Sequence, residues 1–317
     1  MLCWPLRGRH ATGSKGSSVL NVGIIGTGFW ATATHAPVLD EHPEARLVGL
    51  WGRRPEAAER AARETGTRAF TDLAEMLAEV DAVVLTVPPT AQVDLAVRCA
   101  AAGKHLLLEK PLALDPDGAR RVAEAVTSAD VAALVFFTSR HRPEQAAWIQ
   151  AASDRPWFTA HASWTASLFR PDQDRDPANW RHVFGALWDV GPHALSVSLG
   201  VLGEAGTVTA AAGPGDTVHL ALRHTSGASS TATLSLTAPK GAEQSLFTAY
   251  GESGVLSMPT PLSTPREAAY SAISDLVGMV RTGERKHVAD VAFGERVTLA
   301  LHAAAESLRT GTAVSLR

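Results

Sequence analysis

The sequence predicts two folded regions, an α/β region with a parallel sheet followed by an α+β region with a largely antiparallel sheet. Three observations predict this order. The chain has 317 residues, which is enough for two domains of ordinary size. Apolar strands alternate with helices between residues 21 and 140, a pattern typical of a parallel sheet covered on both faces. Farther on, strands follow one another with few helices between them, which favours antiparallel pairing.

Each expected element follows from a local pattern. The helix at 54–66 is rich in Ala, Glu and Arg and ends at Gly66, and the helix at 71–80 is amphipathic. In the first region, strands are expected at 20–25, 45–52, 81–89, 104–111 and 131–139, and the other helices at 29–43, 91–103 and 115–129. In the second region, strands are expected at 157–166, 217–224, 229–237 and 245–251, and helices at 185–203, 266–283 and 291–311.

These patterns divide the chain into three parts. Residues 1–20 have no continuous apolar core of signal-peptide length and are expected to be a disordered leader. Residues 21–140 form the α/β domain and residues 141–317 the α+β domain, which are expected to join near 138–143. No internal repeat interrupts this organisation.

Composition excludes several classes of protein. The formal net charge of −3 gives no basic excess, so a nucleic-acid partner is not expected. No apolar run approaches the roughly 20 residues that cross a bilayer, so no membrane partner is expected. Cys3 and Cys99 lie far apart and the histidines are dispersed, which predicts no metal site and no disulfide framework. A reducing cytoplasm is therefore the expected location.

A glycine-rich turn follows the first strand. Gly26 permits a tight turn, and Gly28 lets the backbone approach a pyrophosphate at the start of a helix. Ala31 takes the third position of this G-x-G-x-x-A pattern. With strand, helix and second strand in sequence, the turn predicts a Rossmann dinucleotide-binding domain. The expected cofactor contacts are Gly26, Thr27, Gly28, Phe29, Trp30, Arg53, Arg54, Pro88, Glu109 and Lys110.

The end of the second strand indicates which dinucleotide binds. NAD sites usually place an acid about 20 residues after the glycines, but this chain has Gly52, Arg53 and Arg54 there. Two guanidinium groups would bind the extra phosphate of NADP through charge-assisted hydrogen bonds. NADP is therefore the expected cofactor, with NAD possible. The alternative is that both arginines are solvated surface residues.

Two further motifs carry candidate catalytic groups. Glu109 and Lys110 end a buried strand, at the sheet edge where ligands bind in open α/β folds. Lys110 is expected to face a substrate, although a salt bridge at a strand end would also explain the pair. Asp189 and His193 lie four residues apart, so on one helix they would meet, but Pro192 interrupts that helix. Taken alone, this Asp/His pair is more often structural.

Together, these motifs resemble the Gfo/Idh/MocA family of oxidoreductases. The resemblance runs from Asn21 to the end and is carried by VGIIGTG, EKPLAL, GALWDVGPHAL and AFGERVTLALHAAAESLRTGTAV. It implies a nicotinamide site in the first domain and an open-faced sheet in the second, often used for oligomerisation. It also implies that Lys110, Asp189 and His193 line the active site and that Glu109 supports Lys110. The chain departs from the family pattern at Gln92, where histidine is common, and at Gly185-Ala186, where two glycines are common.

The expected function is hydride transfer between nicotinamide and a hydroxyl or carbonyl carbon of a sugar, cyclitol or related polyhydroxylated molecule. His193 or Lys110 would accept the proton, and Asp189 would orient His193. Two alternatives remain: a glycosidase with transient internal redox, and a non-catalytic NADP-binding sensor. Expected substrate contacts, in a region equally consistent with a solvated loop, are Lys110, Trp164, Arg170, Trp180, Arg181, His182, Asp189 and His193.

Overall fold

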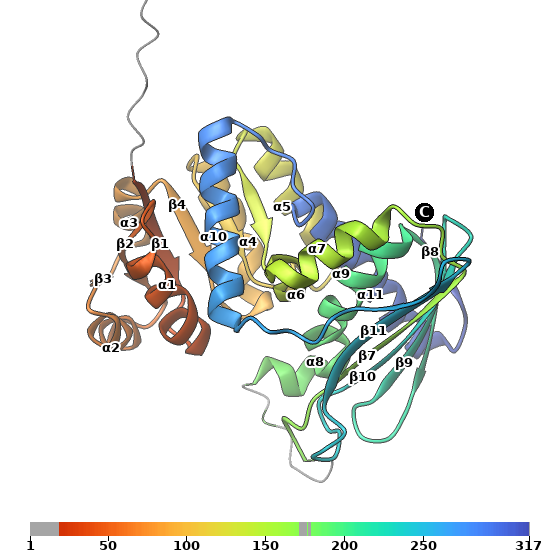
Figure 1. Cartoon of the computed structure of the whole chain (residues 1–317). Helices are drawn as coiled ribbons and strands as arrows, with labels where there is room; N and C mark the ends of the chain where they lie inside the picture. The colour runs from red at the N-terminus through yellow and green to blue at the C-terminus, as the bar shows by residue number, and fades with distance from the viewer. Residues whose placement is uncertain (1–18, 171–175, 177–178, 317) are drawn as a thin grey trace, which may run out of the picture.

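The fold consists of two sheets with helices packed around and between them (Figure 1). The computed structural model describes residues 19–170, 176 and 179–316. Of the expected leader at 1–20, only Val19 and Leu20 lie within the described residues, and Leu20 begins the first strand. In the described ranges, no helix is both long and apolar enough to cross a bilayer.

The first sheet is six-stranded and entirely parallel, as the alternating pattern predicts. Its strand order is β3-β2-β1-β4-β5-β6. The central strands are buried on both faces, which explains their nearly continuous apolar sequences. The strands are β1 (Leu20–Ile25), β2 (Ala45–Trp51), β3 (Arg68–Phe70), β4 (Ala82–Leu85), β5 (His105–Leu108) and β6 (Ala133–Val135). The sequence patterns did not indicate β3, which is only three residues long.

Helices connect these strands. Several of them begin at a capping side chain or end at a glycine. The Asp72 and Asp115 carboxylates cap α3 and α5, and Gly66 ends α2 in the left-handed conformation. The helices are η1 (Trp30–His35), α1 (Ala36–Glu41), α2 (Pro55–Thr65), α3 (Leu73–Glu79), α4 (Pro89–Ala101), α5 (Pro116–Ser128), α6 (Thr138–His141) and α7 (Pro143–Ser153).

The second sheet has seven strands in the order β12-β11-β7-β10-β9-β8-β13. It is mixed: β7 and β10 run parallel, and every other neighbouring pair is antiparallel. Its strands are β7 (Thr159–Thr165), β8 (Ala205–Ala212), β9 (Val218–His224), β10 (Ser229–Ser235), β11 (Gln244–Gly251), β12 (Gly254–Ser257) and β13 (Val314–Ser315). Side chains of β9 alternate between buried and exposed, so one face packs inward and the other is open.

Four helices belong to the second half of the chain: α8 (Trp180–Asp189), α9 (Gly191–Leu202), α10 (Pro265–Thr282) and α11 (Val291–Thr310). Helices α9 and α11 pack on the second sheet. Helix α10 instead returns to the parallel sheet, where Ile273 and Leu276 share a core with Val22 and Ile24 (Figure 1). The sequence boundary near residue 140 therefore does not separate two independent cores.

Candidate active site

A cavity of about 980 Å³ lies at the carboxyl edge of the parallel sheet, between that sheet and helix α8. It brings together the glycine-rich turn, the end of β5 and the α8–α9 junction. Of the residues predicted from sequence, those lining it are Gly26, Thr27, Gly28, Phe29, Trp30, Arg53, Arg54, Pro88, Glu109, Lys110, Trp180, Arg181, Asp189 and His193.

The glycine-rich turn has the geometry that a dinucleotide requires. Gly26 has φ of +135°, and a Cβ there would lie 2.2 Å from Thr86 Oγ1, so no other residue fits. Around a Cβ built on Gly28, no described heavy atom lies within 4 Å. Gly28 therefore opens onto the cavity, and the turn fits a pyrophosphate approaching the start of η1.

Arg53 and Arg54 border the cavity immediately after β2 and are both exposed. Neither forms an ion pair with a carboxylate in the part of the chain that the structure describes. A Cβ on the preceding Gly52 would lie 2.6 Å from Thr27 Cγ2, which brings this segment against the glycine-rich turn. Both guanidinium groups are thus available at the edge of the cavity.

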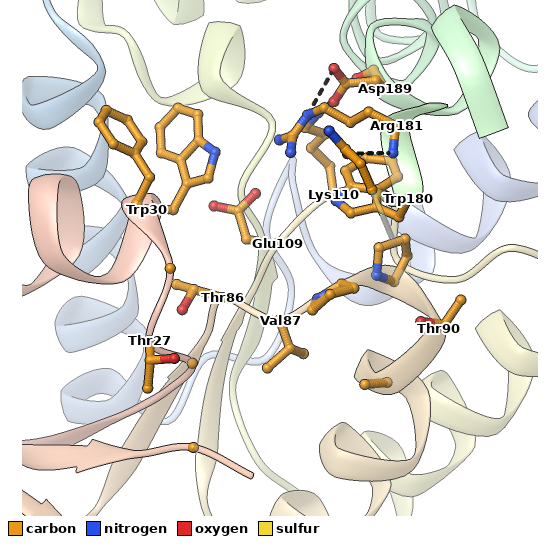
Figure 2. A pocket seen from close by; sticks show the side chains of 18 of the residues that line it. Thr27, Trp30, Thr86, Val87, Thr90, Glu109, Lys110, Trp180, Arg181 and Asp189 are labelled. Carbon is orange, nitrogen blue, oxygen red and sulfur yellow. Dashed lines mark hydrogen bonds and ion pairs between the residues drawn. The ribbon is translucent and has the colours of Figure 1, made fainter. Parts of the chain in front are cut away.

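Lys110 projects from the end of β5 toward the α8–α9 junction (Figure 2). Its Nζ donates hydrogen bonds to Oδ1 and to the backbone oxygen of Asp189, both at 2.7 Å. The Lys110 and Asp189 side chains are 8% and 9% exposed. An ammonium has three protons, so one remains for a ligand in the cavity.

The turn that carries Lys110 is held from behind by Gln92 of α4. The Gln92 amide nitrogen donates to the backbone oxygens of Glu109, Pro111 and Leu112 at 2.7, 2.9 and 3.2 Å. Gln92 is buried and does not line the cavity. It therefore contributes to the backbone position of Lys110, a role that the sequence alone did not indicate.

Asp189 is the shared partner of two cations. Its second carboxylate oxygen, Oδ2, accepts a hydrogen bond from Arg181 Nε at 3.2 Å. Burial alone would raise the pKa of Asp189, but the charges of Lys110 and Arg181 outweigh this effect and hold the pKa below its ordinary value. Asp189 is therefore a carboxylate at neutral pH and fixes both cations.

The expected single helix at 185–203 is broken, which changes the predicted role of Asp189. Helix α8 ends at Asp189, and α9 begins at Gly191 with Pro192 in its first turn. The His193 N–H donates to the Val190 oxygen, so the Asp189 oxygen is left for Lys110. No hydrogen bond joins Asp189 to the His193 ring among the described residues, so Asp189 holds Lys110 instead of orienting His193.

His193 lines the cavity beside the Lys110–Asp189 pair. Burial, followed by the nearby charge of Lys110, lowers the pKa of His193 to about 3. The imidazole is therefore neutral at physiological pH and has a free lone pair for accepting a proton.

Glu109 does not contact Lys110, contrary to the expected support. Its Oε1 lies 3.5 Å from Nε2 of the fully buried His35, and its side chain lies on the Trp30 side of the cavity (Figure 2). Successive residues at the end of β5 therefore face different partners. Glu109 borders the region near the glycine-rich turn, whereas Lys110 reaches the second half of the chain.

The predicted substrate contacts divide into two groups. Trp180 and Arg181 line the cavity, with the Arg181 guanidinium 4.6 Å and Lys110 Nζ 5.8 Å from the Trp180 ring. Trp164 is instead 5% exposed in the core of the second sheet, and its side of β7 faces the packed helices. Arg170 and His182 are also outside the cavity lining, and His182 packs 3.8 Å from the ring of Phe169.

The cavity also includes residues that sequence reasoning missed, among them Trp51, Thr86, Val87, Thr90, Phe169 and Asn179. Thr86 and Val87 follow β4 directly, so their place at the carboxyl edge was available as a signal. Phe169 and Asn179 come from a segment without a regular pattern and gave no signal. Within the described ranges, no group of three or more His, Cys, Asp or Glu residues could hold a metal ion.

Fold and cavity together define a nucleotide-binding oxidoreductase of Rossmann type. Residues 20–137 match the family described as oxidoreductase family, NAD-binding Rossmann fold, and residues 159–257 match the GFO/IDH/MocA C-terminal domain. The chain belongs to the GFO/IDH/MocA oxidoreductase family, which confirms the resemblance and the predicted fold.

Individual relatives extend this comparison. The chain is 34% identical to inositol 2-dehydrogenase of Rhizobium meliloti over 133 residues, covering 42% of this chain and 40% of that protein. It is 24% identical over 207 residues to scyllo-inositol 2-dehydrogenase (NADP(+)) of Bacillus subtilis, covering 62% and 56%. The matches span only 26% to 58% of the curated relatives' own lengths. Levoglucosan dehydrogenase in complex with NADH and levoglucosan has the same fold, with TM-score 0.81, 21% identity and coverage of 94% and 99%.

Proposed function

We propose that this chain transfers a hydride between a nicotinamide cofactor and a hydroxyl or carbonyl carbon of a sugar, cyclitol or related small molecule. The observation that carries this proposal is the Lys110–Asp189 pair, which lies with His193 in the same cavity as the glycine-rich turn. Lys110, Asp189 and His193 are the proposed catalytic residues. Inositol and levoglucosan dehydrogenases among the relatives support the substrate class.

The residues of the chain would manage charge and protons. When bound, nicotinamide supplies the hydride acceptor or donor. The third proton of Lys110 would be donated to the substrate oxygen and stabilise negative charge as the hydroxyl proton leaves. Asp189 would keep that ammonium in place. Because Asp189 fixes Lys110 Nζ before substrate binds, the interaction of Nζ with the substrate oxygen needs little reorganisation during the reaction.

His193 is the proposed acceptor of the hydroxyl proton. It lies at the same end of the cavity as Lys110 and is neutral because its pKa is lowered to about 3. A base with such a low pKa does not retain a proton at neutral pH, so the proton would pass on to solvent. The hydroxyl proton would therefore leave through His193, while Lys110 binds the substrate oxygen.

NADP is the proposed preferred cofactor. The pyrophosphate would lie on the turn Gly26–Trp30, and Glu109 would border the nicotinamide end. Arg53 and Arg54, exposed and without carboxylate partners among the described residues, would bind the additional phosphate. The Bacillus subtilis relative, named for NADP(+), supports this preference.

Assembly and location are also proposals. The second sheet has an open face with exposed side chains such as His161, His219, Arg223 and Thr231, which would pair with a second copy of the chain. Sedimentation or light scattering would report the mass, and Arg223→Glu should shift it toward the monomer. A monomeric wild type would contradict the proposal.

A cytoplasmic location accords with Cys99, whose thiol is buried and free among the described residues.

A substrate screen tests the proposed activity. Purified protein with NADP⁺ is offered sugars, cyclitols and their acids, and protein with NADPH is offered the corresponding carbonyl compounds. Turnover is followed at the nicotinamide absorbance band. Reduction of NADP⁺ by at least one polyol, abolished in Lys110→Met, is the expected result. Cofactor binding without turnover across the panel would contradict it.

A further inference from the structure

The end of the cavity beyond Lys110 contains more positive than negative charge. Lys110 and Arg181 both pair with one carboxylate, that of Asp189 (Figure 2). His193 is neutral, so it does not alter the balance at neutral pH. Among the described residues of this group, two cations therefore face one anion, and one positive charge is uncompensated.

The other charges near this group do not remove the excess. Glu109 lines the same cavity, but its Oε1 lies against His35, and it forms no ion pair with Lys110 or Arg181 among the described residues. Arg142 is a further cation near enough to contribute to the lowered pKa of His193. Glu144 interacts with Arg142 but also accepts hydrogen bonds from Leu262 and Ser263. These groups leave the positive charge at Arg181 in place.

Arg181 has donors available for a ligand. Its guanidinium uses Nε for Asp189 and lies over the ring of Trp180. The side chain is 27% exposed and lines the cavity, and its two terminal nitrogens have no acceptor among the described residues. A guanidinium fixed at Nε presents its terminal amino groups in one plane, which matches a carboxylate.

We infer that the substrate is an anionic polyol, a sugar acid whose carboxylate binds the terminal nitrogens of Arg181 while its reacting hydroxyl binds Lys110. This inference rests on the proposed function and narrows its substrate class. A carboxylate carries one negative charge and therefore balances the single excess positive charge. The Trp180 ring lies near both cations, 5.8 Å from Lys110 Nζ and 4.6 Å from the Arg181 guanidinium, and the sugar carbons would pack against it.

The reaction keeps the carboxylate unchanged. The carbon that bears the hydroxyl would give up a hydride, with its two electrons, and bound nicotinamide would supply the acceptor. The hydroxyl proton passes to His193 and then to solvent, and the carbon–oxygen bond becomes a carbonyl. A cationic amino sugar would be disfavoured, because its ammonium would be placed near Arg181 and Lys110.

Matched substrate pairs test the inference. Glucuronate is compared with glucose, galacturonate with galactose, and glucosamine and glucose 6-phosphate serve as the cationic and dianionic partners. For wild type with NADP⁺, kcat/KM should be at least about tenfold higher for the acids than for the neutral sugars, the effect of one charge-assisted contact. Glucosamine should be the poorest substrate.

Arg181→Gln supplies the decisive variant, with Arg121→Gln on the exposed face of α5 as the matched control. Arg181→Gln should raise KM for the acids about tenfold and change their kcat less, thereby reducing the preference over neutral sugars. Arg181→Lys keeps the charge without the planar donors and should retain part of the preference. Arg121→Gln should behave as wild type.

Binding provides a readout that does not need turnover. Glucuronate should raise the melting temperature of wild type, and Arg181→Gln should reduce that shift. Equal kcat/KM for acids and neutral sugars, or a preference for the phosphate, would overturn the inference and leave the proposed oxidoreductase activity standing. Absence of turnover with every alcohol would instead overturn the proposed function.

Discussion

Lys110 Nζ lies 2.7 Å from two oxygens of Asp189, a residue 79 positions later in the chain. One oxygen belongs to the carboxylate and the other to the backbone at the break between α8 and α9. The contact joins the edge of the parallel sheet to the second half of the molecule. The proposed catalytic arrangement therefore requires that both parts of the chain are packed together.

Asp189→Asn tests this contact. The variant leaves Lys110 and Arg181 facing each other without an anion, and a buried pair that loses one partner costs about 3–5 kcal/mol. We expect a lower free energy of unfolding and a fall in kcat of about 10²-fold or more. Denaturant unfolding and steady-state kinetics provide the measurements. The control, Asp117→Asn in an exposed pair with Arg120, should change neither; normal kcat in Asp189→Asn would refute the role.

The lowered pKa of His193 predicts that kcat/KM depends on pH in an unusual way. Because its pKa is lowered to about 3, the imidazole stays neutral from pH 8 to pH 5, and the proton acceptor is not lost in that range. The plot of kcat/KM for alcohol oxidation should show no inflection near pH 6.5. His193→Asn should be slower at every pH. An inflection near 6.5 in wild type that disappears in His193→Asn would contradict the prediction.

Gln92 is expected to act through the position of Lys110. Gln92→Ala removes the donor to three backbone oxygens and should cost about 1–3 kcal/mol of stability. Because the affected turn carries Lys110, kcat should also fall about tenfold with little change in KM for NADP. Gln145→Ala is the matched control, since that buried amide donates to Pro259 away from the cavity. If Gln92→Ala and Gln145→Ala lower kcat equally, Gln92 contributes to stability only and does not position Lys110.

Cofactor preference depends on Arg53 and Arg54. Replacing both with Ser removes two positive charges from the edge of the cavity, so KM for NADP should rise at least about tenfold while KM for NAD changes little. Arg60→Ser, on the exposed face of α2, controls for a general effect of charge. Comparable Michaelis constants for NAD and NADP in wild type would remove the basis for the prediction.

Regular patterns in the sequence were sufficient to predict the parallel sheet, the glycine-rich turn and the place of Lys110. Each depends on local rules: apolar runs form buried strands, glycines follow the first strand, and strand ends meet at one edge. The return of α10 to the first sheet was not predictable in this way. The apolar face of α10, which includes Ile273 and Leu276, predicts that the helix is buried but not which sheet it packs against.

The expected contact between Asp189 and His193 was wrong because the backbone breaks between α8 and α9. Pro192 was recognised as an interruption, but the consequence, an Asp189 oxygen freed for Lys110, depends on tertiary packing. The family resemblance implied that Glu109 supports Lys110, but both residues follow the end of β5, and their partners, His35 and Asp189, are set by tertiary packing. Trp164 carried no signal that distinguishes a core tryptophan from a substrate contact.

The most direct test of the account is single-turnover hydride transfer in Lys110→Met compared with wild type, both loaded with NADP⁺ and mixed with the best substrate of the screen. The absorbance of the nicotinamide band reports the step itself. We predict that the rate falls about 10³-fold or more, with NADP affinity within a few-fold of wild type and an unchanged circular dichroism spectrum. Transfer at the wild-type rate would contradict the assignment of Lys110 and the mechanism built on it.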